Sequence, residues 1–371
     1  MVLVMKSFLK FFCALVIFSV LLCVCSFIPG IVAANTFHEA LYYQKLDNKK
    51  VNCQLCPRYC VISPGKRGYC RVRENQDGKL ISLAYGKPVA IHIDPIEKKP
   101  LFHFLPSKTA FSVATAGCNL NCKFCQNWEI SQGRPEELYF ITLTPQELVN
   151  KAKESLSPAV AFTYTEPTVF YEYMLETAQL ARSQGLKSVM HSNGYINEEP
   201  LRKLAKYLDA ANIDLKGFKE EYYAKICEGS LEPVLKSLKV LKEEGVHLEI
   251  TNLVLTGFND DPESITKMCL WIKDNLGAET PLHFSRFFPM YKLLGLNPTP
   301  VATLENARKI ALDCGLKYVY IGNIPGHTGE NTYCPKCKKI VIKRVGYIVQ
   351  EINLQQGVCK FCQEKIEGVW N

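Results

Sequence analysis

The chain has 371 residues, of which 47% are hydrophobic and 22% charged, so it has room for two or three ordinary globular domains. Its formal net charge of +8 is mild and spread out, and we find no concentrated basic patch of the kind that nucleic-acid binding requires, so we expect no nucleic-acid partner. Eleven of the 17 cysteines fall into three groups in which Cys-x2-Cys spacing recurs, which indicates metal binding rather than a disulfide framework.

The N-terminal region, residues 1–34, contains an apolar stretch without a charged side chain at residues 11–34. A bilayer crossing takes about 20 residues, whereas the apolar core of a signal peptide has roughly 7–15. We therefore expect membrane association through residues 11–34, as a transmembrane helix or a signal. Three alternatives stay open: the segment is an anchor, it is cleaved after Ala34, or translation starts later.

Residues 35–105 are expected to form an N-terminal cysteine-rich module. Cys53 and Cys56 make a Cys-x2-Cys pair, and Cys60 and Cys70 complete a set of four thiols. Four thiolates suit a zinc ion or an iron–sulfur cluster, and the spacing does not choose between these two metals.

In residues 106–328, apolar β-branched runs alternate with helical stretches. The runs cover residues 110–114, 160–164, 187–192, 211–215, 248–255, 283–287 and 318–321. One helical stretch begins at Thr144, and the others cover residues 169–184, 198–208, 233–244, 262–276 and 304–314. This alternation predicts an α/β fold whose parallel strands are joined by right-handed crossovers. The number of units suits a full or partial barrel, with the chemistry at the C-terminal ends of the strands.

Three cysteines, Cys118, Cys122 and Cys125, follow the first of these runs with Cys-x3-Cys-x2-Cys spacing. A structural zinc site takes four ligands, so this compact trio fits zinc poorly. Three thiolates can instead hold three irons of a [4Fe–4S] cluster and leave the fourth iron open to a small molecule. The trio therefore predicts an enzyme, and the alternatives are a structural cluster and a fortuitous group of cysteines.

Polar residues follow the next three runs, at the edge where the trio is expected. Glu166 follows the second run, Asn193 and Gly194 follow the third, and Asp214 and Lys216 follow the fourth. A carboxylate suits an ammonium group, an aspartate suits ribose hydroxyls, and a lysine suits a carboxylate. The alternatives are a capping glutamate, an ordinary Asn-Gly turn and a surface ion pair.

Residues 329–371 carry two further Cys-x2-Cys pairs, Cys334 with Cys337 and Cys359 with Cys362. The strands that we expect between the pairs cover residues 340–344 and 347–353. This spacing predicts a zinc ribbon, in which four thiolates close a structural site and contribute to the free energy of folding. A single rubredoxin-like iron is the alternative.

The cysteine trio resembles the signature of the radical S-adenosylmethionine (radical SAM) family, including the aromatic Phe124 before the last cysteine. This resemblance implies a partial (β/α)6 barrel. It also implies reductive cleavage of SAM at the [4Fe–4S] cluster to a 5′-deoxyadenosyl radical, which abstracts hydrogen from a substrate. The residues that the resemblance assigns to SAM binding are Glu166, Asn193, Gly194, Asp214 and Lys216. The chain departs from the family's Gly-Gly-Glu motif, because tyrosine and threonine precede Glu166.

Beyond the apolar segment, the chain resembles the radical SAM enzyme of the AmmeMemoRadiSam system, a branch related to pyruvate formate-lyase activating enzymes. The runs that carry this resemblance are residues 53–57, 94–100, 117–132, 166–168 and 331–335. It implies a protein or peptide substrate from that system, and a radical SAM enzyme takes its electrons from a low-potential donor of the flavodoxin or ferredoxin type. The alternatives are radical chemistry on a small molecule and a multi-cluster electron-transfer protein. Because SAM and such donors are cytosolic, we expect the chemistry on the cytoplasmic side.

Overall fold

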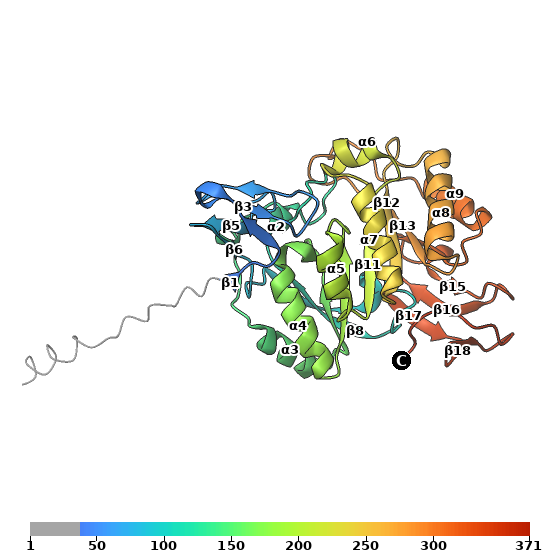
Figure 1. Ribbon diagram of the computed structural model, residues 1–371. Helices are drawn as coiled ribbons and strands as arrows, with labels where there is room; N and C mark the ends of the chain where they lie inside the picture. Colours follow the sequence, from blue (N-terminus) through green and yellow to red (C-terminus); the bar gives the residue numbers. More distant parts are fainter. Residues whose placement is uncertain (1–37) are drawn as a thin grey trace, which may run out of the picture. The chain divides into compact units, whose positions relative to one another are not determined.

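An eight-stranded sheet organises the structure, a computed structural model that describes residues 38–371 (Figure 1). Its strands lie in the order β14-β13-β12-β11-β10-β9-β8-β7. Their bounds are β7 Ala90–Pro95, β8 Thr109–Ala114, β9 Ala159–Phe162, β10 Lys187–Ser192, β11 Ala210–Asp214, β12 His247–Val254, β13 Leu282–Arg286 and β14 Val319–Gly322. Strands β8 to β14 pair in parallel, and β7 pairs antiparallel with β8. The seven predicted runs are the seven parallel strands, which confirms the α/β fold class.

Helices connect the parallel strands and pack against them (Figure 1). Their bounds are α3 Pro145–Glu154, α4 Tyr171–Ser183, α5 Glu198–Ala205, α7 Glu232–Glu243, α8 Pro262–Leu276 and α9 Val301–Asp313. Thr144 caps α3, because its side chain accepts a hydrogen bond from the Glu147 N–H while the Glu147 side chain accepts one from the Thr144 N–H. The glycines that follow α4, α7 and α9 have φ of +77°, +75° and +99°, as helix ends commonly require.

Short strands before and after the large sheet surround the other cysteine groups. Residues 38–82 contain β1 His38–Glu39, β2 Tyr43–Lys45, β3 Val51–Cys53, β4 Val61–Ile62, β5 Arg73–Gln76 and β6 Lys79–Ser82. The C-terminal strands are β15 Thr332–Tyr333, β16 Ile340–Val345, β17 Ile348–Ile352, β18 Leu354–Gln355 and β19 Val358–Cys359. Strands β16 and β17 are the two that the sequence predicts between the C-terminal cysteine pairs. Single 3-10 turns cover Asp47–Lys49, Ile96–Lys98, Pro135–Glu137, Pro167–Phe170 and Thr328–Glu330.

The segment around the four N-terminal cysteines shares the hydrophobic core of the large sheet. Val51, Leu55 and Val72 are buried in the same cluster as Val113 of β8 and Phe162 of β9. The sheet also takes β7 from residues 35–105. These observations do not confirm a separate N-terminal module, because its apolar side chains are buried against the large sheet.

No helix within residues 38–371 combines the length and the apolar character that crossing a bilayer requires. This finding contradicts the prediction of a transmembrane helix and of a membrane-associated protein. The segment that prompted the prediction, residues 11–34, lies outside the described residues.

His103 lies at the contact between the large sheet and the C-terminal residues, and it predicts a loss of stability in acid. Its Nδ1 lies 2.6 Å from the Glu367 carbonyl oxygen, so this nitrogen carries the proton, and its Nε2 lies 2.5 Å from the Tyr320 hydroxyl. Burial lowers the pKa of His103 to about 4, against about 6.5 in the unfolded chain.

Between these two pH values the unfolded chain binds a proton that the folded chain does not. The contribution of His103 to the free energy of unfolding should therefore be complete above about pH 6.5. It should fall on acidification, and at pH 4 the loss should be on the order of 3 kcal/mol. Denaturant titrations between pH 7 and 4 test this. His103→Gln should flatten the slope, and an equal slope in both proteins would contradict the assignment.

Candidate active site

The cysteine trio occupies the loop that follows β8, at the carboxyl edge of the parallel strands, and α2 (Trp128–Ser131) follows it. The N–H groups of Asn121 and Lys123 donate to the carbonyl oxygens of Cys227 and Ile226 at 3.0 and 2.9 Å. These acceptors lie in η5 (Tyr223–Cys227), a π-helical turn that continues α6 (Glu220–Tyr222). The loop is therefore held by backbone hydrogen bonds from a distant part of the chain.

Gly117 begins this loop in a conformation that only glycine tolerates. Its φ is +98°, and a Cβ at this position would lie 2.8 Å from the Cys70 carbonyl oxygen and 2.7 Å from the Val72 side chain. The backbone ahead of Cys118 is thus in direct contact with the segment that carries Cys70.

The thiols of the trio fit a cluster better than a single ion. Among the described residues, the ligand atoms of one group of cysteines, at the C-terminus, all lie within 4.8 Å of one another. The sulfurs of the trio do not form such a group with one another or with nearby histidines and carboxylates. The Leu120 N–H donates to Cys118 Sγ at 3.4 Å, and Asn193 Nδ2 lies 3.7 Å from the same sulfur. N–H groups aimed at ligand sulfurs are a common feature around iron–sulfur clusters.

The three thiols differ in acidity. The pKa of Cys122 is lowered, first by a hydrogen bond from the Cys227 thiol and then, against the effect of burial, by the charge of Lys216. Burial raises the pKa of Cys118 and of Cys125. Since iron binds thiolates, loading the loop must release protons from these two groups.

Glu166 is buried and is already engaged within the protein. Its Oε1 accepts from the Thr168 N–H at 2.9 Å and from the Ser192 hydroxyl at 2.7 Å, and its Oε2 accepts from the Asn193 N–H at 2.8 Å. Burial raises the pKa of Glu166, while the hydrogen bonds oppose this shift. The carboxylate thus fixes the turn after β10.

Asn193 and Gly194 lie in that turn, beside the cysteine loop. Asn193 Nδ2 lies 2.9 Å from Asn119 Oδ1, so the amide bridges the turn and the loop. Gly194 has a φ of +68°, and a Cβ there would lie 2.9 Å from the Ile213 side chain. The geometry needs glycine at this position and places the asparagine amide next to Cys118.

Asp214 and Lys216 form an ion pair at the end of β11. Lys216 Nζ lies 2.9 Å from Asp214 Oδ2, and His191 Nε2 lies 3.0 Å from Asp214 Oδ1. Burial alone would raise the pKa of Asp214, but Lys216 and His191 hold it below its ordinary value. Lys216 Nζ also lies 5.6 Å from the centre of the Phe124 ring, which places this charge beside the trio.

Two neighbours of the trio were missed as functional residues. His191 lies in the predicted strand at residues 187–192, but nothing in the sequence pairs it with Asp214. Cys227 lies outside the three predicted cysteine groups; it is buried, and its thiol contacts Cys122. No local signal identifies either contact, because both partners come from distant segments.

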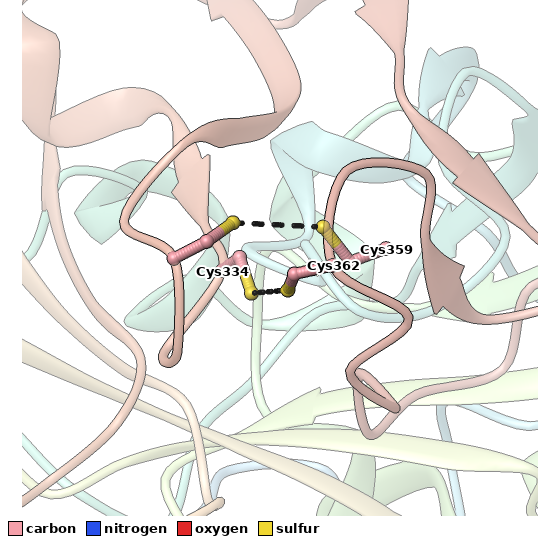
Figure 2. A group of neighbouring side chains, drawn as sticks. Cys334, Cys359 and Cys362 are labelled. Carbon is pink, nitrogen blue, oxygen red and sulfur yellow. Dashed lines mark hydrogen bonds between the residues drawn. The ribbon is translucent and has the colours of Figure 1, made fainter.

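The C-terminal cysteines form the tightest group of thiols. The sulfurs of Cys334, Cys337, Cys359 and Cys362 all lie within 4.8 Å of one another. Cys334 and Cys362 are separated by 3.5 Å and Cys337 and Cys359 by 3.8 Å, sulfur to sulfur; Figure 2 shows Cys334, Cys359 and Cys362 converging on one point. A zinc–sulfur bond of about 2.3 Å implies sulfurs about 3.8 Å apart in a tetrahedron. This group therefore fits one tetrahedral metal ion.

Comparisons with known proteins find a family match in the region that holds the trio. A model of the radical SAM superfamily matches residues 112–269. Uncharacterized protein MJ0808 of Methanocaldococcus jannaschii is 50% identical over 333 residues, which are 89% of this chain and 99% of that protein. Pyruvate formate-lyase 1-activating enzyme of Escherichia coli is 22% identical over 55% of this chain and 89% of that enzyme.

Among solved structures, a domain of a pyruvate-formate lyase-activating enzyme from Bacteroides vulgatus is similar, with a TM-score of 0.39 and 18% identity. The match covers 44% of this chain and 98% of that chain. The family match in sequence and the candidate site thus fall in the same part of the molecule.

Proposed function

Because the chain belongs to the radical SAM superfamily and is an enzyme, we propose that it abstracts a hydrogen atom from a protein or peptide substrate, as a glycyl-radical activating enzyme does. The family implies a [4Fe–4S] cluster and SAM, which together would supply the reductive cleavage of SAM to methionine and a 5′-deoxyadenosyl radical. One observation carries the proposal: three thiols on one loop lie at the carboxyl edge of a parallel sheet, beside the Asp214–Lys216 ion pair. The sequence similarity to an activating enzyme supports a protein substrate.

The trio and the side chains around it would bind different parts of the cluster and of SAM. Cys118, Cys122 and Cys125 would hold three irons and leave the fourth for SAM. Lys216 would pair with the SAM carboxylate, and Asp214, kept ionised by its partners, would accept hydrogen bonds from the ribose hydroxyls.

Asn193 and Gly194 would line the same site, since the Asn193 amide lies beside Cys118. Glu166 would act through them: both its oxygens hold the turn after β10. We therefore assign Glu166 the role of a positioning residue.

Radical SAM enzymes need a reductant, and we propose a flavodoxin or ferredoxin as the donor. The mild positive charge of the chain is compatible with such acidic proteins. We also place the chain in the AmmeMemoRadiSam branch, because the runs at residues 53–57, 94–100 and 331–335 resemble that enzyme. The substrate would then be a protein of that system.

Hydrogen transfer from the substrate tests the proposal. The full chain, loaded anaerobically with its cluster, is mixed with SAM, a strong reductant and a deuterated candidate protein, and the 5′-deoxyadenosine is analysed by mass spectrometry. Deuterium in this product is expected with the correct protein. Transfer from a deuterated small molecule, and from none of the proteins, would favour the alternative substrate class.

The role of Lys216 can be measured separately as SAM affinity. Removing one partner of a buried charge pair costs about 2–5 kcal/mol, so Lys216→Ala should weaken SAM binding at least about thirtyfold. Lys225→Ala is the matched control, because Lys225 is exposed and pairs with Glu221 on the protein surface. Equal dissociation constants for the two variants, measured by calorimetry on cluster-loaded protein, would exclude Lys216 from the SAM site.

A further inference from the structure

The four N-terminal cysteines line one cavity although they come from different turns of the chain. Cys53 lies at the end of β3, Cys56 and Cys60 lie between β3 and β4, and Cys70 lies before β5. Their side chains line one small pocket. Arg58 and Arg73 are the charged residues that line this pocket.

The separation of these four sulfurs argues against a single ion. The C-terminal ribbon brings its four sulfurs within 4.8 Å, whereas no three of the N-terminal sulfurs meet this condition. The same is true of Cys118, Cys122 and Cys125, which belong to the signature of a cluster-binding family. Among the described residues, the C-terminal cysteines form the one close group of thiols, and the N-terminal cysteines resemble the catalytic trio in lying outside such a group. A zinc ion would instead require four thiolates about 2.3 Å from the metal, and therefore a close group such as the C-terminal one.

The charges around the cavity also suit an anionic group. The Arg73 side chain is buried, its Nη1 lies 3.8 Å from Cys53 Sγ, and its Nε has no hydrogen-bond partner. Arg73 also pairs with buried Glu172, so it is fixed in place. A buried cation beside a ligand sulfur fits a cluster whose thiolates and sulfides accept hydrogen bonds.

Arg58 supplies the second positive charge and links the cavity to the catalytic loop. Its guanidinium lies 3.7 Å from the centre of the Tyr69 ring, and its Nε donates to the Asn119 carbonyl oxygen at 2.9 Å. Asn119 follows Cys118 in the sequence and also lines the cavity. The two cysteine groups are therefore direct neighbours in the fold.

We propose that Cys53, Cys56, Cys60 and Cys70 bind a second iron–sulfur cluster, a [4Fe–4S] cluster with four thiolate ligands, beside the radical SAM cluster. All four of its irons have protein ligands, so this cluster has no open iron for a small molecule. The site is independent of the substrate proposed above, because it uses neither the trio nor the residues assigned to SAM.

Metal and sulfide analysis of the full chain after anaerobic reconstitution tests the proposal. Two [4Fe–4S] clusters predict about eight irons and eight sulfides per chain, and one zinc in the ribbon. The variant in which Cys118, Cys122 and Cys125 are all serine should keep about four irons and four sulfides, with the Mössbauer spectrum of a [4Fe–4S] cluster. The double variant Cys56→Ser/Cys60→Ser should lose about four irons, and Cys314→Ser, outside all three groups, should lose none.

The triple serine variant decides the matter even when the double variant does not fold, because it leaves the N-terminal cysteines intact. About four irons with a cluster spectrum in this variant would support the second cluster. No iron together with a second equivalent of zinc would overturn it. Neither result depends on deoxyadenosine formation, so failure of this proposal and failure of the proposed function are distinguishable.

Discussion

Replacing Cys122 with alanine is expected to abolish 5′-deoxyadenosine formation from SAM. Cys122 is the thiol of the trio whose pKa is lowered, and the loop that carries it is held by backbone bonds to η5. Loss of a residue that merely contacts a metal ligand costs about 10–100-fold, so loss of a ligand from a three-ligand site should cost more than about 100-fold. The fold should persist, because the hydrogen bonds of Asn121 and Lys123 use the backbone.

The measurement is 5′-deoxyadenosine by mass spectrometry after anaerobic reconstitution and reduction. Cys314→Ala is the matched control, because Cys314 lies outside all three cysteine groups and its pKa is raised chiefly by burial. Equal product from Cys122→Ala and the parent would remove Cys122 from the cluster. No product from a parent with a reducible cluster would favour the multi-cluster electron carrier.

Replacing Cys362 with alanine is expected to prevent the C-terminal cysteines from holding a metal ion and to unfold residues 329–371, the predicted zinc ribbon. Cys362 Sγ lies 3.5 Å from Cys334 Sγ, so its loss opens the tetrahedron. Structural zinc sites contribute about 10–16 kcal/mol of apparent binding free energy, far more than the few strands of this segment can replace. The loss should expose the aromatic side chains that pack on it, Phe102 and Tyr320.

Elemental analysis and amide hydrogen exchange follow this change. The parent should contain about one zinc per chain in the ribbon, and an iron in its place would identify the rubredoxin-like alternative. Lys336→Ala is the control, because Lys336 is exposed and makes a surface ion pair with Glu364, so its loss should cost at most about 1 kcal/mol. Full protection of residues 329–371 in Cys362→Ala would show that the ribbon folds without its metal.

Local patterns predicted much of the fold. The seven parallel strands follow from apolar runs, and the start of α3 follows from the capping box of Thr144 and Glu147. Strand β7 was not predicted, since Asp94-Pro95 looks like part of a connector. It forms because it pairs along its whole length with β8, from Ala90 with Ala114 to Pro95 with Thr109, and such a contact depends on tertiary structure.

The candidate site was predicted as a set of residues but not as a set of contacts. Spacing brings the trio, Asn193 and Asp214 to one edge of the sheet, as parallel strands require. It does not reveal that both carboxylate oxygens of Glu166 accept hydrogen bonds within the protein, from Ser192, Thr168 and Asn193. Nor does it pair Cys122 with Cys227, because this contact needs the π-helical turn to dock on the loop.

The contact at Gly117 has consequences for the insertion of iron into this protein and for its loss by oxidation. The backbone there has no room for a methyl group between itself and the Cys70 carbonyl, so a shift of one thiol-bearing loop pushes directly on the other. Iron insertion at one loop should therefore order its neighbour, and oxidative loss of iron from one should loosen both. The two loops are expected to behave as a single unit of assembly and of oxygen damage.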